Sequence, residues 1–309
     1  MFTLRENVPL APLTTFRVGG PARYYSEVSC ALEMAEVLDY AEKHELPLCI
    51  IGGGSNTLFS DKGFPGIVTR VIDGGISVSH DRVAAGAGMM LHEVVRAAEL
   101  AGLQGIEKLA GIPGSFGGAL RGNAGAFGTE IGDHVMSVKA LDRHTGMVHE
   151  YDLTKCQFSY RESVFKKNSH LVILSGELKL KVGDKAELER IARETVATRE
   201  AKHPQSAKCA GSFFMNPTVT DKHLLAEFEK DTGKPTKDGK LPAGWLIDHV
   251  GLRGKKIGDA QVSQMHPNYI VNTGKATAED IITLASLVKT RVRDELGVRL
   301  REEVQFVGF

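Results

Sequence analysis

A glycine-rich run at residues 111–128 constrains the fold of this chain more than any other stretch. Seven of its residues are glycine, and Arg121 is its one charged side chain. Glycine reaches positive φ and lets other groups approach the main chain, at a cost in backbone entropy, so we expect no ordinary helix or strand here. A flexible linker is one interpretation. We favour a backbone cradle whose N–H groups face an anion, because apolar residues are spaced through the run, whereas linkers are rich in Ser or charge.

The segments before this run predict an α/β arrangement. Residues 13–23 and 24–28 are typical of two short strands around a Gly-Gly-Pro turn, residues 31–45 carry a helical apolar stripe, and residues 48–51 form a short buried strand. Strand, helix and strand make a βαβ unit. A second glycine stretch, 52–56, directly follows the last strand, at the position where α/β folds place ligands.

The rest of the chain alternates strands and helices. Hairpins or further strands are expected at 67–72, 76–79, 82–85, 135–141, 148–151, 171–175, 177–181, 269–272 and 303–307. Helices are expected at 90–101, with Leu91, Val94, Val95 and Ala98 facing inward, and at 185–201, 243–250 and 277–295. A domain boundary is expected near residues 203–207, at a Pro-containing polar stretch.

Length and composition limit the class of protein. A chain of 309 residues exceeds what one hydrophobic core usually serves, so two or three domains are expected. Lys plus Arg equal Asp plus Glu, at 38 each, which argues against a nucleic-acid or membrane surface as the main partner.

The four cysteines and the N-terminus indicate a cytoplasmic protein. The cysteines are scattered, with no CxxC pair and no metal-ligand spacing, so we expect reduced thiols and no metal site. The first residues contain no apolar core of signal-peptide length. No apolar run reaches the ~20 residues of a membrane helix.

Known nucleotide-binding motifs are missing from the sequence. No GxGxxG opens a helix with an acidic residue ~20 positions on, and no GxxxxGK[ST] occurs. Two glycine cradles, at 52–56 and 111–128, remain. They suit a long dinucleotide, and a flavin dinucleotide held by loops is consistent with them.

Three residues outside the glycine stretches are candidates for chemistry. Arg161, beside an aromatic residue, suits planar binding of a carboxylate or phosphate; the alternative is a surface arginine paired with Glu162. Ser212 follows two small residues and is open to close approach; the alternative is a turn serine, and no GxSxG elbow surrounds it. A carboxylate of Arg301-Glu-Glu-Val-Gln-Phe306 could serve acid–base chemistry where the terminal strand begins; the alternative is a solvated strand end.

The order of these motifs resembles the UDP-N-acetylenolpyruvoylglucosamine reductase family, flavoenzymes that make UDP-N-acetylmuramate for bacterial peptidoglycan. The resemblance covers nearly the whole chain, and the interval between Arg161 and Ser212 is short, as in the family's second, shorter type. The motifs that carry it are Thr14-Thr-Phe-Arg-Val-Gly-Gly-Pro21, Ile51-Gly-Gly-Gly-Ser-Asn56, Gly111-Ile-Pro-Gly114, Asn123-Ala-Gly-Ala-Phe-Gly128, Tyr160-Arg-Glu-Ser163, Ala210-Gly-Ser-Phe-Phe214 and Glu303-Val304.

The resemblance implies an α+β fold of three domains, of the vanillyl-alcohol-oxidase and p-cresol-methylhydroxylase type, with a substrate-binding domain. The implied division is 1–72 and 73–204 for two FAD-binding subdomains, 205–297 for the UDP-sugar domain, and 298–309 for a C-terminal strand that returns to the active site. It also implies non-covalent FAD, NADPH as co-substrate, small-molecule partners without nucleic acid or membrane, and a monomer or weak oligomer.

Residue roles follow from the same resemblance. Ser212 would be the proton donor, and Arg161 and Glu303, rather than Glu302, would stabilise the enol form of the substrate carboxylate. Residues implied to contact the UDP-sugar are Tyr160, Lys202 and Asn216. Residues implied to hold FAD are Gly52, Gly53, Gly54, Ser55, Asn56, Gly111, Ile112, Pro113, Gly114, Gly118, Asn123, Gly125, Ala126 and Gly128. Two departures from the family pattern are Met215, where Lys is common, and Arg121, where a neutral residue is common.

The implied chemistry has two halves. NADPH reduces FAD and leaves, and the enolpyruvyl ether takes the vacated place and receives hydride at its vinyl CH2 carbon. We expect Glu303 to be protonated so that it donates to the enolate, and Ser212 to protonate the carbon. Two rivals remain: another flavin oxidase on the same fold, since fold alone does not decide function, and a nucleotide-binding module with no redox cofactor.

Overall fold

The computed structural model describes residues 2–72, 74–202, 207–236 and 238–309. Its contacts divide the chain into two compact units. Unit 1 comprises Met1–Val8, Ala22–Gly54 and Phe64–Ala201, and unit 2 comprises Pro9–Pro21, Ser55–Gly63 and Lys202–Phe309. The predicted boundaries at residue 73 and at 204–205 lie outside the described residues, and the four-part division stays a prediction.

Unit 1 contains a four-stranded sheet in the order β1–β2–β5–β3. Its strands are β1 (Arg5–Pro9), β2 (Pro21–Val28), β5 (Phe64–Val71) and β3 (Leu48–Ile51). Both β2 and β3 pair with β5 in parallel. Helix α1 (Ala31–Lys43) makes the crossover that two parallel strands require. The predicted βαβ unit is therefore confirmed, with β5 inserted between its two strands.

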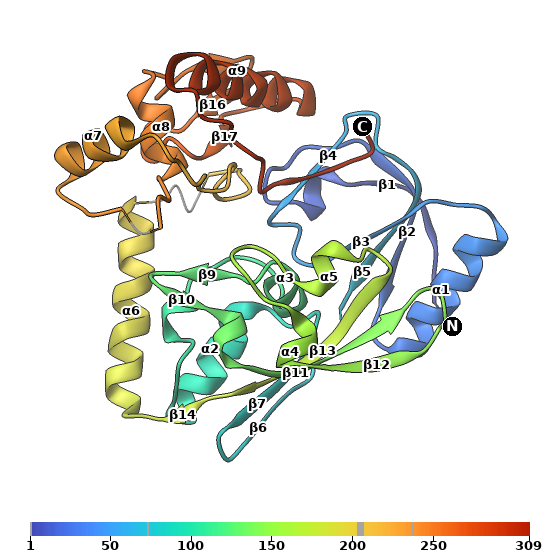
Figure 1. Ribbon diagram of the computed structural model, residues 1–309. Helices are drawn as coiled ribbons and strands as arrows, with labels where there is room; N and C mark the ends of the chain where they lie inside the picture. The colour runs from blue at the N-terminus through green and yellow to red at the C-terminus, as the bar shows by residue number, and fades with distance from the viewer. Residues whose placement is uncertain (1, 73, 203–206, 237) are drawn as a thin grey trace. The chain divides into compact units, whose positions relative to one another are not determined.

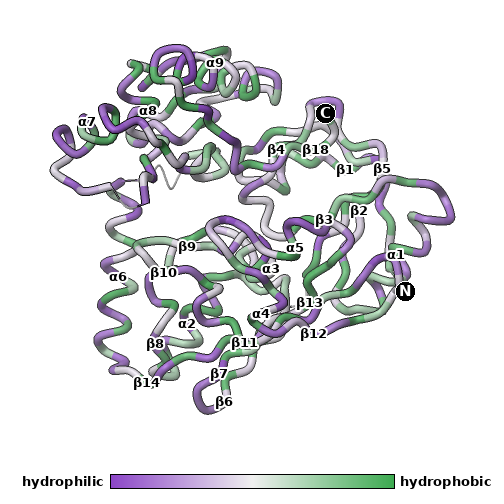
Figure 2. Tube along the Cα trace, viewed as in Figure 1, coloured by the Kyte–Doolittle hydropathy of each residue, from purple (hydrophilic) through white to green (hydrophobic). Residues whose placement is uncertain are grey.

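A second, antiparallel sheet of unit 1 has the order β12–β11–β13–β7–β6. Its strands are β12 (Val148–Asp152), β11 (Val135–Asp142), β13 (Leu171–Lys179), β7 (Arg82–Gly86) and β6 (Ile76–Ser79). The β6–β7 and β11–β12 hairpins are confirmed. Helices α2 (Leu91–Leu100) and α3 (Phe116–Arg121) lie beside this sheet (Figure 1). The tip of the β6–β7 hairpin is hydrophilic (Figure 2).

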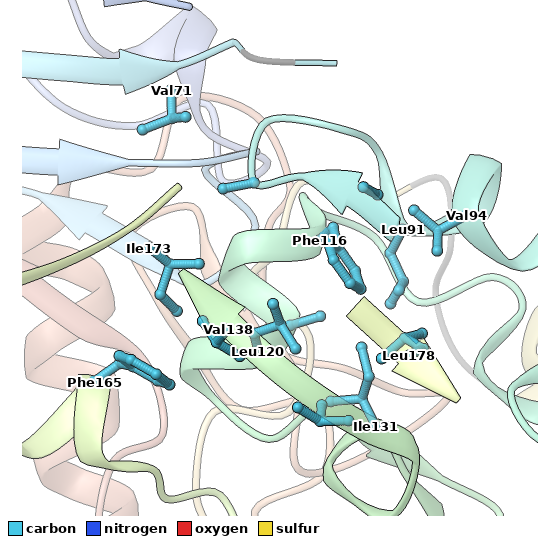
Figure 3. Close-up of a cluster of buried hydrophobic side chains, with 14 of the residues drawn as sticks. Val71, Leu91, Val94, Phe116, Leu120, Ile131, Val138, Phe165, Ile173 and Leu178 are labelled. Atoms are coloured by element: carbon cyan, nitrogen blue, oxygen red, sulfur yellow. The ribbon is translucent and has the colours of Figure 1, made fainter. Parts of the chain in front are cut away.

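The core of unit 1 lies between these helices and the sheet. The inward positions predicted for α2, Leu91, Val94, Val95 and Ala98, are each at most 1% exposed. Figure 3 shows Phe116 and Leu120 of α3 in the same cluster as Val138 and Leu178 of the sheet. This packing holds α3, and with it the glycine run, on the sheet.

Short elements complete unit 1. They are β8 (Leu103–Gln104) paired with β14 (Lys181–Val182), β9 (Gly125–Ala126) paired with β10 (Thr129–Glu130), the 3₁₀ turns η2 (Glu107–Leu109) and η3 (Ile131–His134), and helices α4 (Leu153–Cys156) and α5 (Val164–Lys167). Helix α6 (Lys185–Lys202) confirms the predicted charged helix.

Unit 2 is built on two small sheets and three helices. Its elements are η1 (Ala11–Leu13), β4 (Thr57–Phe59) parallel to β18 (Gln305–Val307), the antiparallel set β15 (Lys256–Ile257), β16 (Ala260–Val262) and β17 (Ile270–Asn272), and helices α7 (Lys222–Thr232), α8 (Ala243–His249) and α9 (Ala278–Leu296). A capping box of Thr277 and Asp280 starts α9, and left-handed Gly297 ends it. Three sequence-based elements, at 243–250, 269–272 and 277–295, are confirmed, and the terminal strand is shorter than expected.

The predicted strand at residues 13–23 is wrong. Strand β1 ends at Pro9 and β2 begins at Pro21, so only residues 21–23 of this stretch are in a strand, and the residues between β1 and β2 form η1 and an irregular turn. The Thr14 hydroxyl donates to the carbonyl of Val18, and Gly20 N–H donates to Ser60 O. The first bond closes the segment on itself and the second ties it to Ser60, because a threonine side chain competes with a neighbouring strand for backbone groups.

Two strand assignments need correction. Residues 67–72 do not form a hairpin with 76–79, since β5 belongs to the other, parallel sheet. Residues 171–175 and 177–181 are not separate strands, because β13 runs through Gly176. A Cβ at Gly176 would lie 2.7 Å from Leu120 Cδ1, so this glycine admits α3 against the sheet rather than breaking the strand.

The expectation of no regular structure in the glycine run is also wrong in part. Residues 116–121 form α3, which the Ser115 hydroxyl caps by accepting a bond from Gly118 N–H. A Cβ at Gly117 would lie 2.7 Å from Ala87 Cβ. The helix uses glycine for close packing, because tertiary contacts outweigh its weak helix propensity.

Candidate functional site

The two glycine stretches of the sequence meet in unit 1. A Cβ at Gly53 would lie 2.8 Å from Gly114 Cα, and a Cβ at Gly52 would overlap Ser115 Oγ. The loop after β3 and the loop before α3 thus pack backbone against backbone. Positive φ at Gly54 (65°), Gly111 (76°) and Gly114 (118°) bends both loops in a way that other residues rarely adopt.

These loops leave backbone donors for a ligand. Among the residues that the structure describes, the N–H groups of Gly53, Gly54 and Gly114 donate to no protein acceptor. A cluster of unpaired N–H groups at a strand's carboxyl end is typical of a phosphate-binding cradle. The arrangement fits a diphosphate, and the linker interpretation does not fit loops packed this closely.

The second half of the run is arranged differently. A Cβ at Gly125, in β9, would lie 2.9 Å from Glu130 Cγ, whereas one at Gly128 would meet no atom within 4 Å. Gly118 has room for a Cβ at 3.4 Å from Ser115 Oγ. Ile112 packs against the core. Of these predicted cofactor residues, Gly125 alone both lies in a paired strand and has a neighbouring side chain too close to admit a Cβ.

Asn123 supports protein segments with its side chain. The residue is 1% exposed and has φ of 44°. Its Nδ2 donates to Glu130 Oε2 (2.6 Å) and to Ser159 O (2.9 Å), and its Oδ1 accepts from Gly132 N (3.0 Å). The side chain therefore ties the end of the glycine run to the turn that carries the candidate arginine.

That arginine, Arg161, points its guanidinium at the glycine run. Nη2 donates to Gly125 O (3.1 Å) and Nη1 to Asn123 O (3.4 Å), and the guanidinium carbon lies 5.3 Å from the ring centre of Tyr160. The alternative of a surface pair with Glu162 does not describe this site, because Glu162 pairs with Lys166 at 3.4 Å. Arg161 itself has φ of 58°, a conformation often kept at functional positions.

The other two candidates lie together in unit 2. Gly211, with φ of 75°, precedes Ser212, and Glu303 N donates to Phe213 O (2.8 Å). Phe214 bridges Glu302 in antiparallel fashion. Segments more than 80 residues apart in sequence thus place Ser212 and Glu303 on adjoining extended chains.

Glu302 and Glu303 have different surroundings. The Glu302 carboxylate pairs with Lys289 Nζ of α9 at 2.6 Å. The Glu303 backbone is held by Asn56, whose Nδ2 donates to Glu303 O (3.0 Å) and whose carbonyl accepts from Gln305 N (3.0 Å). Glu302 is therefore committed to a structural ion pair, which is consistent with assigning the chemistry to Glu303.

The remaining predicted residues are distributed over both units. Lys202 is the last residue of α6 and is exposed. Asn216 Oδ1 accepts from Ala243 N (2.9 Å), at the start of α8. Met215 donates its backbone N–H to Arg301 O. Arg121 ends α3, and burial lowers the pKa of its guanidinium.

Sequence reasoning missed Asn268, which is 3% exposed and bonds to the segment of Ser212. A single buried amide carries no local signal in the sequence. Two surface hollows are lined by other residues. One of about 330 Å³, in unit 2, is lined by Phe228, Lys234, Pro235, Asp238, Lys240 and Pro242. One of about 430 Å³ lies on the five-stranded sheet of unit 1.

In residues 2–72, 74–202, 207–236 and 238–309, no group of three or more His, Cys, Asp or Glu side chains could hold a metal ion. Across the same residues, no helix is both long and apolar enough to cross a membrane.

Two family models match the chain. The model described as UDP-N-acetylenolpyruvoylglucosamine reductase, C-terminal domain, matches residues 203–307. The model described as FAD binding domain matches residues 22–152.

Similar proteins match over the whole length. UDP-N-acetylenolpyruvoylglucosamine reductase of Solibacter usitatus is 36% identical, over 98% of this chain and 96% of the relative. The enzyme of that name from Synechococcus sp. (strain WH7803) is 38% identical, over 99% of this chain and 94% of the relative. The crystal structure of UDP-N-acetylenolpyruvylglucosamine reductase (MurB) from Thermus caldophilus superposes with a TM-score of 0.76 at 31% identity, covering 100% of this chain and 99% of that one.

Proposed function

Because this chain belongs to the UDP-N-acetylenolpyruvoylglucosamine reductase family, we propose that it reduces UDP-N-acetylglucosamine enolpyruvate to UDP-N-acetylmuramate with NADPH. The protein is an FAD-dependent oxidoreductase of peptidoglycan precursor synthesis. Its fold is α+β, with an FAD-binding domain of the vanillyl-alcohol-oxidase type. Neither rival function considered from the sequence, another flavin oxidase or a nucleotide-binding module without a redox cofactor, is needed to explain these matches.

The packed glycine loops are the structural observation that carries the proposal. The unpaired N–H groups of Gly53, Gly54 and Gly114 suit the FAD pyrophosphate. Backbone donors can bind it where the two loops lie too close together to admit a side chain. Further FAD contacts are proposed from Gly52, Ser55, Asn56, Gly111, Ile112, Pro113, Gly118, Asn123, Gly125, Ala126 and Gly128. Asn56 and Asn123 would act through the backbone segments they hold.

When bound, FAD supplies hydride to the vinyl CH2 carbon after accepting it from NADPH. The chain must then stabilise the negative charge that spreads from the adjacent carbon onto the substrate carboxylate. We assign this to Arg161, whose guanidinium is fixed by the carbonyls of Asn123 and Gly125. A preorganised donor of this kind is worth about 3 kcal/mol in the transition state, because charge develops only there.

Ser212 is the proposed proton donor. Its Oγ–H would transfer the proton to the carbon next to the carboxylate, and the serine would regain a proton from solvent. An alcohol is a weak acid, but the enolate carbon is strongly basic, so the transfer is downhill. Glu303, protonated, would donate to the enolate oxygen.

The UDP-sugar is the proposed ligand of Tyr160, Lys202 and Asn216. Lys202 supplies a cation for the diphosphate. Because the Asn216 carbonyl oxygen already accepts from Ala243, its Nδ2 group is the part that suits a sugar or uracil acceptor. We also propose a cytoplasmic protein that is a monomer or weak oligomer and binds small molecules rather than nucleic acid, consistent with the balanced charge of the chain.

Product analysis tests the reaction. The purified protein should be yellow from bound FAD, and with NADPH and the enolpyruvyl substrate it should form a product whose mass is larger by two hydrogens. Protein that takes up no FAD, or that oxidises NADPH without reducing the enol ether, would contradict the proposal.

A further inference from the structure

Asn268, in the loop before β17, is joined to the segment of Ser212 by three hydrogen bonds. Its side-chain Oδ1 accepts from Phe214 N (3.0 Å), its Nδ2 donates to Phe214 O (2.8 Å), and its backbone carbonyl accepts from Phe213 N (2.7 Å). The side chain is 3% exposed, so these bonds are shielded from water. Asn268 thus hydrogen-bonds to the backbone of the two residues after Ser212 as a neighbouring strand would.

The opposite edge of the same segment is also paired. Phe213 O accepts from Glu303 N at 2.8 Å, and Met215 N donates to Arg301 O at 2.9 Å. Phe213 and Phe214 therefore lie between the chain that carries Glu303 and the amide of Asn268. Their side chains are at most 1% exposed, so the anchor is fixed by packing as well.

Gly211, directly before Ser212, packs loosely, although Cys209 and Ala210 before it are buried, at 8% and 5% exposed. Gly211 has φ of 75°, and a Cβ at this position would meet no atom within 4 Å. Its N–H bonds to the Cys209 side chain, and among the described residues neither Gly211 nor Ser212 makes a backbone–backbone hydrogen bond. The backbone support nearest to the serine hydroxyl therefore lies on its C-terminal side, at Phe213 and Phe214.

A second layer holds Asn268 in place. His266 Nδ1 accepts from Asn268 N (3.2 Å), and the Ser263 hydroxyl accepts from His266 N (3.3 Å). Side chains of this loop thus hydrogen-bond to the backbone of the same loop and hold Asn268 in place. Such support is what a site needs to keep a reacting group within a fraction of an ångström of its working position.

We propose that Asn268 is a positioning residue for proton donation, holding the Phe213–Phe214 backbone so that the Ser212 hydroxyl meets the substrate carbon. The inference rests on the proposed function, because it takes Ser212 as the proton donor. It assigns to Asn268 no contact with the substrate or the cofactor. Its effect should therefore fall on the step that uses Ser212 and not on reduction of FAD by NADPH.

Asn268→Asp is the test variant, and Asn272→Asp is its matched control. An ionised aspartate keeps the acceptor for Phe214 N but loses the donor to Phe214 O. Asn272 is a buried amide of the same unit, 6% exposed, whose Nδ2 donates to Phe16 O (3.1 Å) and whose Oδ1 accepts from Gly274 N and Ala276 N. Both variants should lose stability, but the control leaves the Phe214 bonds intact.

The measurement is rapid mixing of each holoenzyme, first with NADPH and then, after reduction, with the enolpyruvyl substrate. For Asn268→Asp we expect flavin reoxidation by substrate to slow by about 10²-fold, as for a reacting group displaced by ~1 Å. Flavin reduction by NADPH and FAD content should match the unmodified protein. For Asn272→Asp neither half-reaction should slow in this selective way.

A pH profile gives a second readout. A protonated aspartate carries an O–H donor and a carbonyl acceptor, which can replace the two Asn268 side-chain bonds to Phe214, so reoxidation by Asn268→Asp should recover as the pH falls. Titratable and charged groups around the anchor are His266, Tyr269, Glu302, Glu303, Lys289 and Arg301. Because they are common to both proteins, the ratio of variant to unmodified rate isolates the introduced carboxyl group.

The outcomes separate cleanly. Selective slowing of reoxidation with recovery at low pH supports the inference. Unchanged reoxidation in Asn268→Asp, equal slowing of both half-reactions, or equal slowing in the control overturns it. If Asn268→Asp does not fold, Asn268→Ser removes the amide without adding charge and is judged by the same half-reactions. Failure of the proposed function is distinguishable, because the unmodified reduced enzyme would then not be reoxidised by substrate.

Discussion

Gly53→Ala should weaken FAD binding although it adds a single methyl group. The new Cβ would lie 2.8 Å from Gly114 Cα, whereas ordinary van der Waals contact begins at 3.4 Å. The two loops must therefore separate by about 0.6 Å (3.4 − 2.8), because the obstructing atom is backbone and cannot rotate away. Such a shift is enough to lengthen a hydrogen bond from one loop to the pyrophosphate.

The expected magnitude follows from that lost bond. A hydrogen bond to a charged group contributes about 2 kcal/mol, so the Kd for FAD should rise about 30-fold. The assay is titration of the FAD-free protein with FAD, followed by flavin fluorescence. Gly122→Ala is the control, because Gly122 is not among the proposed FAD contacts and its Cβ would lie 3.5 Å from Gly118 O, an ordinary contact.

The same pair of variants refutes the reasoning if it is wrong. FAD affinity in Gly53→Ala that equals that of the unmodified protein would show that the loops are not the pyrophosphate site. An equal loss in Gly122→Ala would show that any added methyl group in the glycine run has the effect. Thermal unfolding of the FAD-free proteins separates binding from folding, since overpacking at Gly53 should cost about 1–3 kcal/mol of stability.

Three other predictions concern residues of the two units. Arg161→Ala should lower turnover by about 10²-fold while FAD content stays constant; loss of FAD instead, measured by absorbance, would make Arg161 a cofactor ligand. Lys289→Met breaks a half-exposed pair with Glu302 and should cost no more than about 1 kcal/mol in urea unfolding; a loss of several kcal/mol would contradict this assessment. Burial lowers the pKa of His266 in the folded protein, so the unfolded chain binds a proton at this residue more readily. The stability that the neutral histidine contributes is therefore present above the unfolded pKa, and it is lost as the pH falls through the ordinary histidine range towards the folded pKa. Chemical denaturation from neutral to mildly acid pH should show this decline, and His266→Gln should flatten it.

Local periodicity predicted α1, α2, α6, α8 and α9, but not α7 or the short helices α3, α4 and α5. The apolar stripe of α2 placed Leu91, Val94, Val95 and Ala98 in the core, because a 3.6-residue repeat is a property of the segment itself. Strand partners were less predictable. The assignment of 67–72 to a hairpin failed, since pairing of β5 with β2 and β3 depends on segments before it in sequence.

The candidate site was predictable in its residue types but not in its contacts. The two glycine stretches suggested cradles, yet only the structure brings Gly53 against Gly114. Asn123 is predicted to contact the cofactor, and nothing in the sequence indicated that its side chain bonds to Glu130, Ser159 and Gly132. Asn268 was missed. A buried amide looks the same in sequence whether it holds a catalytic segment or a turn, because its partners come from distant parts of the chain.

Reoxidation of the reduced enzyme tests the central claim most directly. The protein is reduced with NADPH in the absence of oxygen and mixed rapidly with UDP-N-acetylglucosamine enolpyruvate, and return of the oxidised flavin absorbance is recorded for the unmodified protein and for Ser212→Ala. The account predicts rapid reoxidation that forms UDP-N-acetylmuramate in the unmodified protein, and normal reduction followed by loss of reoxidation in Ser212→Ala. Reduced flavin that the enol ether does not reoxidise, or a Ser212→Ala protein with both half-reactions intact, would contradict it.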